Sequence, residues 1–273
     1  MNKQIKKNNS SQKAAQMQAY KQALKRNKPF ALPDTDKKIV ASLGWSSAYK
    51  GRLHGYFIPE TWHEVRIDVD PATQADLLQH PHNLPMIADS SVDGVFIGHM
   101  LHRYSFHEAK LILQEAVRIM KDGGVLIASV PDLQLAATFA ANDEMEAAIY
   151  TSPAGGITAL DMIFGFQKFV ATGDAARQHR SGYSLASFGN FLRDAGLSNL
   201  NITRQAYDLQ GVGLKLPYGH PERVERIMLQ TEPANRPNAP AIPAPAAAQT
   251  TAVRYADLLE GEPQRWKPLN LKK

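Results

Sequence analysis

The stretch from Val65 to Asp132 decides the fold of this chain. It contains VRIDVDP at residues 65–71, SSVDGVFIGHMLHR at 90–103 and KDGGVLIASVPD at 121–132. Each segment is typical of an apolar strand that ends in acidic or small polar residues. An amphipathic helix is predicted over Glu108–Lys121, between the second and third segments. This alternation predicts a mostly parallel α/β sheet, which binds ligands at the carboxyl ends of its strands.

The composition is that of a single α/β domain with extensions. The chain has 273 residues, of which 44% are hydrophobic and 21% are charged. It contains no cysteine, which excludes disulfides, thiolate metal sites and cysteine nucleophiles. No apolar run approaches the roughly 20 residues of a membrane-spanning helix, and the polar N-terminus has no secretory signal. We therefore expect a cytoplasmic protein without a transmembrane span.

The net charge of +5 is concentrated at the ends of the chain. Residues 1–28 contain eight Lys/Arg and no acid, whereas residues 29–230 contain 17 basic and 22 acidic residues. A domain that binds nucleic acid usually has a basic face on the fold itself, so a nucleic-acid partner is not expected. For the basic arm two interpretations remain open. One is a contact for a protein partner or an anionic surface, and the other is a solvated extension.

The sequence divides into four parts. A basic, partly helical extension over residues 1–37 precedes an α/β domain at 38–230, in which residues 133–183 are an inserted substrate lobe. Residues 231–250 are a Pro/Ala-rich linker, and residues 251–273 are a tail with too few apolar residues to fold alone. The tail could dock on the domain or on a partner.

Seven strands and several helices are predicted within the α/β domain. Two helical patterns flank TSPAGG (151–156) in the lobe, and a further helix is predicted over Leu185–Ala195. The strands are Ile39–Leu43, Val65–Asp68, Ala75–Leu78, Val92–Gly98, Val125–Val130, Ile202–Tyr207 and Arg226–Gln230.

The order of these segments resembles that of class I S-adenosylmethionine-dependent methyltransferases of the type 11 kind. The resemblance covers roughly residues 38–207 and implies a Rossmann-like fold. This fold is a mostly parallel seven-stranded sheet with helices on both faces and a helical insertion after strand five. The resemblance also implies S-adenosylmethionine as cofactor and a hydroxyl or amine of a small molecule or glycan as methyl acceptor. The matching segments are LGWSS (43–47), VRIDVDP, HNLP (82–85), SVDGVFIGHMLHR and KDGGVLIASVPD, with SPAGGITALDMIFGFQKF (152–169) and QHRSGYSLASFGNFLRDAGL (178–197) similar to a bacterial subgroup of methyltransferases.

Two acids and two positions of the first loop are implied to bind the cofactor. Asp68 ends strand two, where the family's acid accepts hydrogen bonds from both ribose hydroxyls. Asp70 either assists Asp68 or caps the turn that follows. Gly44 is the one glycine kept from the family's glycine-rich turn, and Trp45 stands at the position of the second glycine.

Two histidines complete the implied cofactor site. His80 stands where the family often has an acid that receives the adenine amino group, and it is otherwise a surface histidine. His99 keeps its place after strand four, beside the methionine end of the cofactor.

His179 is the candidate catalytic base, because a base that works near neutral pH is best supplied by histidine. Tyr183 and Asp132 are its candidate partners. The other interpretation is that His179 caps the helix that begins near Ser184. The remaining histidines lack the spacing and the acid of a zinc site, so no metal is expected.

Two classes of function therefore remain open. One is an active methyltransferase, supported by Asp68 and by the lobe. The other is a catalytically inactive methyltransferase-fold protein that serves as a binding or scaffold subunit, favoured by the incomplete glycine turn. An NAD-binding Rossmann protein is disfavoured because Gly-x-Gly-x-x-Gly is absent.

Overall fold

The computed structural model describes residues 30–44, 53–152, 154–173 and 175–215. The residues outside these ranges include Trp45, the basic arm before residue 30, the linker and the C-terminal tail. Within the described ranges, no helix has both the length and the apolar character required to cross a membrane.

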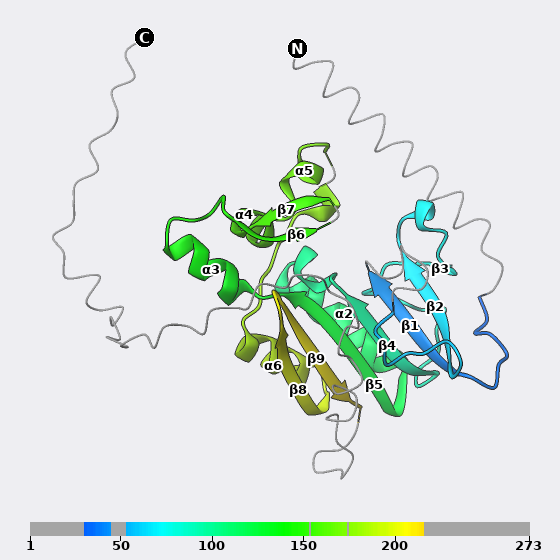
Figure 1. Cartoon of the computed structure of the whole chain (residues 1–273). Coiled ribbons are helices and arrows are strands. Elements are labelled where there is room, and N and C mark those ends of the chain that lie inside the picture. Colours follow the sequence, from blue (N-terminus) through cyan, green and yellow to red (C-terminus); the bar gives the residue numbers. More distant parts are fainter. Residues whose placement is uncertain (1–29, 45–52, 153, 174, 216–273) are drawn as a thin grey trace. The chain divides into compact units, whose positions relative to one another are not determined.

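The core of the molecule is one seven-stranded sheet (Figure 1). Its strands are β1 Lys38–Gly44, β2 Trp62–Asp68, β3 Leu77–Leu78, β4 Val92–Gly98, β5 Met120–Pro131, β8 Ser198–Gln205 and β9 Asp208–Leu214. They lie in the order β3-β2-β1-β4-β5-β9-β8. The pairs among β1 to β5 are parallel, and β9 is antiparallel to both β5 and β8. The predicted mostly parallel seven-stranded sheet is confirmed.

The last strand differs from the prediction, which placed it at Arg226–Gln230. Among the described residues it is β9, whose sequence DLQGVGL was missed because glycine disfavours strands. The glycines have a packing role here. A Cβ on Gly211 would lie 2.5 Å from Leu192, on helix α6 (Leu185–Asp194), and one on Gly213 would lie 2.7 Å from Leu200. Arg226–Gln230 lies outside the described residues.

Helices α2 (Phe106–Ile119) and α6 cover one face of the sheet. Helix α2 begins at Ser105, whose side chain forms a capping box with Glu108. Its buried face packs on alternate residues of the strands, in one apolar cluster with α6. The predicted helices on this face are therefore present.

The opposite face of the sheet is covered, within the described residues, by the loop that leads into β2. Phe57 and Trp62 pack edge-to-face with ring centroids 4.9 Å apart, in a cluster with Val40, Phe96 and further residues of β5 and β9. Gly94 gives these rings room, because a Cβ there would lie 3.0 Å from Phe57. No helix of the described residues is assigned to this second cluster.

The predicted helical insertion after β5 is present, and it also contains a two-stranded hairpin. Within its TSPAGG segment, Thr151 and Ser152 end the first strand and pair antiparallel with Gly156 and Gly155 at the start of the second, and glycine disfavours a helix there. Figure 1 shows the lobe at the end of β5, next to the start of β9. Its elements are α3 Leu133–Ala141, β6 Ala148–Ser152, β7 Gly155–Thr158, α4 Ala159–Phe164, α5 Gln167–Val170 and the short 3-10 helix η3 Ala175–Arg177.

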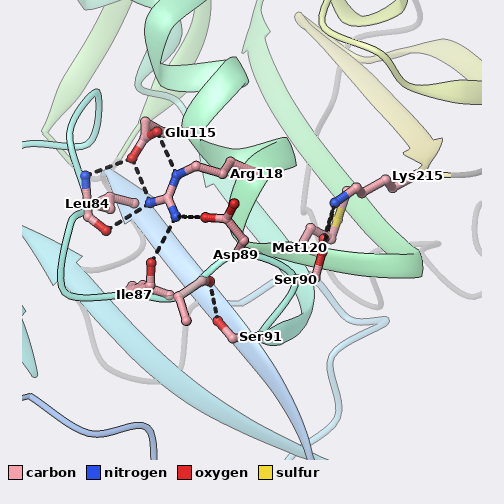
Figure 2. Close-up of polar contacts among 10 residues, drawn as sticks. Leu84, Ile87, Asp89, Ser90, Ser91, Glu115, Arg118, Met120 and Lys215 are labelled. Atoms are coloured by element: carbon pink, nitrogen blue, oxygen red, sulfur yellow. Dashed lines mark hydrogen bonds and ion pairs between the residues drawn. The ribbon is translucent and has the colours of Figure 1, made fainter.

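Arg118 on α2 fastens the loop that precedes β4 (Figure 2). Its guanidinium donates to Glu115 on the same helix at 2.8 Å and to Asp89 in the loop at 2.6 Å. It also donates to the backbone carbonyls of Ile87 and Leu84, at 3.0 and 2.9 Å. The loop before β4 is thereby held against α2 by one planar, five-donor group.

Candidate functional site

The sheet brings three of the predicted cofactor residues to one edge. Gly44 at the end of β1 pairs with Gly98 at the end of β4, and β1 also pairs with β2, which ends at Asp68. His99 directly follows β4. In a parallel sheet these carboxyl ends form the ligand-binding edge.

Asp68 has a fixed carboxylate. Its Oδ1 accepts hydrogen bonds from the backbone N–H groups of Val69 at 2.7 Å and Asp70 at 2.9 Å. These two backbone donors hold the carboxylate in one orientation.

Asp70 has a local structural role. Its Oδ1 accepts from the backbone N–H of Ala72 at 2.9 Å and caps the short 3-10 helix η1 (Pro71–Thr73). This contact matches the second of the two interpretations of Asp70, a cap of the turn after β2.

Gly44 has a φ of +87°, which disfavours any residue with a side chain. A Cβ there would lie 2.4 Å from the Cβ of Met100. The close approach that glycine permits at this position is therefore made by the side chain of Met100, which is itself buried.

His80 packs against a second histidine. Its ring stacks on that of His82 with centroids 4.0 Å apart, and Tyr104 lies edge-on at 6.0 Å. Burial lowers the pKa of His80, and His82 lowers it further, while Glu108 opposes the shift. His80 is therefore half-buried and neutral near pH 7, which suits a hydrogen-bond acceptor.

A cavity of about 310 Å³ lies between the ends of β4 and β5, the start of β9 and the lobe. From the sheet side it is lined by His99, by His102 on the short 3-10 helix η2 (Leu101–Arg103), and by Asp208. From the lobe side it is lined by His179 and Tyr150. His99 therefore both follows β4 at the strand-end edge and lines the cavity.

His179 is held in the cavity wall with a defined tautomer. Its Nδ1 lies 2.8 Å from the carbonyl oxygen of Met162, and a carbonyl only accepts, so Nδ1 holds the proton and Nε2 has the lone pair. Burial lowers the pKa of His179 to about 4; the Met162 bond opposes this shift, and Arg103 and His99 add to it. The His179 ring packs edge-on against His102, with centroids 4.2 Å apart.

The predicted partners of His179 have structural roles instead. Tyr183 is fully buried among Phe106, Phe188 and Phe191, and burial raises the pKa of its hydroxyl to about 12.

The Asp132 carboxylate caps α3 by accepting a hydrogen bond from the backbone N–H of Gln134 at 2.9 Å. It accepts a second one from Nε of Arg204 at 2.7 Å. Asp132 and Tyr183 meet through a β-bridge, not at the His179 ring. Their predicted catalytic roles are not supported by these contacts.

Sequence reasoning missed several residues that line the cavity. Four of them are His102, Tyr150, Tyr207 and Asp208. His102 is buried, and burial holds its pKa well below the usual value. Asp208 begins the unpredicted strand β9, and Tyr207, which directly precedes it, stacks on Tyr150 at a centroid distance of 3.5 Å. Of these four residues, only His102 had a signal in the sequence, because it stands in the loop after β4 that also holds the predicted site residue His99.

No group of three or more His, Asp or Glu side chains in the described part of the chain is arranged to hold a metal ion.

The sheet order, with an antiparallel strand inserted between β5 and β8, defines a class I methyltransferase fold.

Comparison with protein families agrees with the fold. Residues 58–128 match the family model described as a methyltransferase domain. This segment runs from the loop before β2 into β5. A comparison with curated protein sequences found no significant match.

Similar solved structures include the 1,6-didemethyltoxoflavin N1-methyltransferase of Burkholderia thailandensis, crystallised with S-adenosylhomocysteine. It is 13% identical, with 66% of this chain and 72% of that chain covered and a TM-score of 0.42. A methyltransferase of Methanosarcina mazei is 12% identical, with 67% and 94% covered and a TM-score of 0.43. One of Aquifex aeolicus is 16% identical, with 65% and 83% covered and a TM-score of 0.41. The fold assignment rests on the strand order, not on these distant likenesses.

Proposed function

We propose that this protein is an S-adenosylmethionine-dependent methyltransferase whose acceptor binds in the cavity under the lobe. The observation that supports this most is the position of His99, which directly follows β4 at the strand-end edge and also lines the cavity. A methyl donor at the edge formed by Gly44 and Asp68 would then face an acceptor beside His179.

The residues of the cofactor edge fit this group. The Asp68 carboxylate is oriented by two backbone N–H groups, and a carboxylate is a strong acceptor for ribose hydroxyls. In the proposal His80 accepts from the adenine amino group, His99 lies at the methionine end, Asp70 supports the turn that holds Asp68, and Gly44 and Trp45 form the first loop. When bound, the cofactor supplies a methyl group on a positively charged sulfur.

His179 would position the acceptor and receive its proton. Its Nε2 lone pair can accept a hydrogen bond from an acceptor hydroxyl or amine. An imidazole with a pKa of about 4 does not remove a proton from a free hydroxyl. It can take the proton once the oxygen–methyl bond forms, because the methylated oxygen is then strongly acidic. Alignment therefore supplies most of the catalysis.

The acceptor proposed here is a hydroxyl or amine of a small molecule or glycan, because the cavity is of the size typical of small-molecule sites. The second candidate function is an inactive methyltransferase-fold binding or scaffold protein. It is favoured by Met100, whose side chain takes the close approach to Gly44 that a cofactor would use.

Calorimetric titration with S-adenosylmethionine and S-adenosylhomocysteine distinguishes the two candidates. The enzyme should bind both, with the affinity retained when residues 1–28 are removed. No heat of binding at millimolar cofactor would leave the scaffold function as the better proposal.

A further inference from the structure

Two imidazole rings lie in contact in the wall of the cavity under the lobe. The ring of His102 packs edge-on against that of His179, with centroids 4.2 Å apart and an interplanar angle of 81°. Both residues also line a second cavity of about 240 Å³, which has Leu133, Phe164 and Gly182 in its wall. The two histidines are therefore the residues with ring nitrogens in the wall that the two cavities share.

Backbone hydrogen bonds fix the two rings relative to each other. The carbonyl oxygen of His102 accepts from the backbone N–H groups of Arg180 at 2.8 Å and Ser181 at 3.1 Å. The backbone N–H of His179 donates to the carbonyl oxygen of Phe164 at 3.2 Å. The pair is thus anchored to η2 on one side and to α4 on the other, and its geometry is set before a ligand arrives.

One ring of the pair is a hydrogen-bond acceptor. Burial lowers the pKa of His102 and of His179, so both rings are neutral near pH 7, and each has one N–H and one lone pair. In His179 the proton is on Nδ1, which donates to the carbonyl oxygen of Met162. The lone pair of His179 is therefore on Nε2, which can accept a hydrogen bond from a hydroxyl of a ligand.

The other ring of the pair is a hydrogen-bond donor. Nδ1 of His102 is enclosed by protein and has no hydrogen-bond partner within the described residues. Buried N–H groups without an acceptor are rarer in folded proteins than buried acceptors without a donor. This preference places the lone pair of His102 on Nδ1 and its proton on Nε2. Because Nδ1 is enclosed, Nε2 is also the nitrogen of His102 that a ligand can reach.

A donor in contact with an acceptor fits two neighbouring oxygens of a ligand. Hydrogen bonds between nitrogen and oxygen span about 2.7–3.2 Å, so oxygens on two adjacent carbons can meet one ring each. Oxygens on opposite sides of a six-membered ring are too far apart for this. An N–H that donated to the reacting oxygen would withdraw electron density from it. The better partner for His102 is therefore the neighbouring oxygen, while the reacting hydroxyl donates to His179.

We propose that the methyl acceptor is a compound with a hydroxyl group next to a second oxygen function, the hydroxyl held by His179 and the second oxygen by His102. The inference rests on the proposed function, because it names the substrate class of that enzyme. His102 is a positioning residue in this arrangement, since it orients the second oxygen and takes no part in the transfer of the methyl group or the proton.

Three matched probes test the spacing without any cofactor. They are cis-cyclohexane-1,2-diol (the vicinal diol), cis-cyclohexane-1,4-diol and cyclohexanol, which share one carbon ring and differ in the number and spacing of their hydroxyl groups. In calorimetric titration of the full chain near neutral pH, the vicinal diol should bind about tenfold tighter than either other probe, because it alone bonds both rings. Equal affinities of the two diols, or no binding of the vicinal diol at tens of millimolar, would overturn the proposal.

The variant His102→Leu tests the residue itself. It replaces the donor by apolar atoms, so binding of the vicinal diol should weaken about tenfold while that of cyclohexanol changes by less than about twofold. His102→Gln should recover part of the preference, because the glutamine amide offers an N–H donor. His63→Leu is the matched control, because His63 is at an exposed position of β2, and it should leave all three affinities unchanged. Full retention of the vicinal-diol preference in His102→Leu would contradict the assignment.

Nitrogen NMR of the wild type determines the two tautomers directly, and it decides even if His102→Leu fails to fold. Protonated and unprotonated ring nitrogens differ in chemical shift. The spectrum near neutral pH should therefore show the proton on Nε2 of His102 and on Nδ1 of His179. A proton on Nδ1 of His102 would overturn the proposal, because both rings would then be acceptors.

The outcome is separable from that of the proposed function. No binding of S-adenosylhomocysteine with the vicinal-diol preference intact would reject the methyltransferase and keep the diol site. The reverse result would reject the diol site alone.

Discussion

The Nδ1–H of His179 donates a hydrogen bond to the carbonyl oxygen of Met162 at 2.8 Å, in the wall of the cavity under the lobe. Burial lowers the pKa of His179 to about 4. Burial also lowers the pKa of His54 to about 4. The His54 ring contacts Gln210 of β9, on the face of the sheet that α2 and α6 do not cover. Both imidazoles therefore stay neutral in the folded protein at pH values where an unfolded chain protonates them.

Acid should destabilise the protein well before its carboxylates titrate. Below pH 6.5, the ordinary histidine value, the unfolded chain takes up protons that the buried rings refuse until about pH 4. The free energy of unfolding should fall through this window by up to about 1.4 kcal/mol per pH unit for each ring. Above pH 6.5 both states are neutral and the effect vanishes. Urea unfolding at about pH 7.5, 6 and 5 measures it.

The variant His54→Gln isolates one of these contributions and should flatten the pH dependence, whereas His63→Gln, at an exposed position of β2, should not. If His54→Gln has the same pH dependence as the wild type, the buried imidazole is not the cause.

Arg118 should be a main determinant of stability, because its guanidinium bonds two backbone carbonyls and Glu115 at once. Arg118→Leu is expected to lower the free energy of unfolding by about 2–3 kcal/mol, since buried acceptors lose their donors. Arg118→Lys should recover only part of this free energy of unfolding, because the ammonium of lysine cannot reproduce the planar set of N–H donors of a guanidinium. Urea unfolding measures both. The control is Arg193→Leu, because Arg193 is exposed on α6 and donates to the side chain of Asn190 on the same helix. Its free energy of unfolding should stay within about 0.5 kcal/mol of wild type.

The turn after β1 should tolerate no side chain. Gly44→Ala combines a φ of +87° with a Cβ placed 2.4 Å from Met100. The backbone cost is about 1–2 kcal/mol, and the overlap adds about 1–3 kcal/mol. Gly123→Ala is the matched control, because its φ is +79° with nothing within 4 Å of the added Cβ. Thermal unfolding should rank Gly44→Ala below Gly123→Ala. Equal stabilities would mean that Met100 moves away without cost.

The parts of the fold that the sequence predicted are those with unbroken hydrophobic patterns. The strand at Val92–Gly98 was predicted with the bounds that the structure has, because it is buried on both faces. The helix predicted over Glu108–Lys121 begins earlier, at Phe106, since Ser105 and Glu108 form a capping box. Strand β9 was missed because its pattern is interrupted by Gly211 and Gly213, whose function is close packing against other side chains.

The site was less predictable than the fold, because its geometry depends on contacts between distant segments. The histidine at 179 was found through a family resemblance, yet its actual partner is a backbone carbonyl, which leaves no trace in side-chain patterns. Tyr183 had a polar hydroxyl and a suitable position in sequence, but packing places it in the core. Asp208 was overlooked because the strand that positions it was not predicted.

Asp68 and Asp70 should differ sharply in their effect on cofactor binding, although only one residue separates them. Asp68→Ala should weaken S-adenosylhomocysteine about tenfold or more, because charge-assisted hydrogen bonds worth roughly 1.5–3 kcal/mol are lost. Asp70→Ala removes the cap of η1 and should weaken S-adenosylhomocysteine binding by less than about threefold, because it acts only through the turn that follows Asp68. Calorimetric titration of both variants measures this. Wild-type affinity in Asp68→Ala would exclude Asp68 from the site, and a tenfold loss in Asp70→Ala would show that Asp70 binds the cofactor directly.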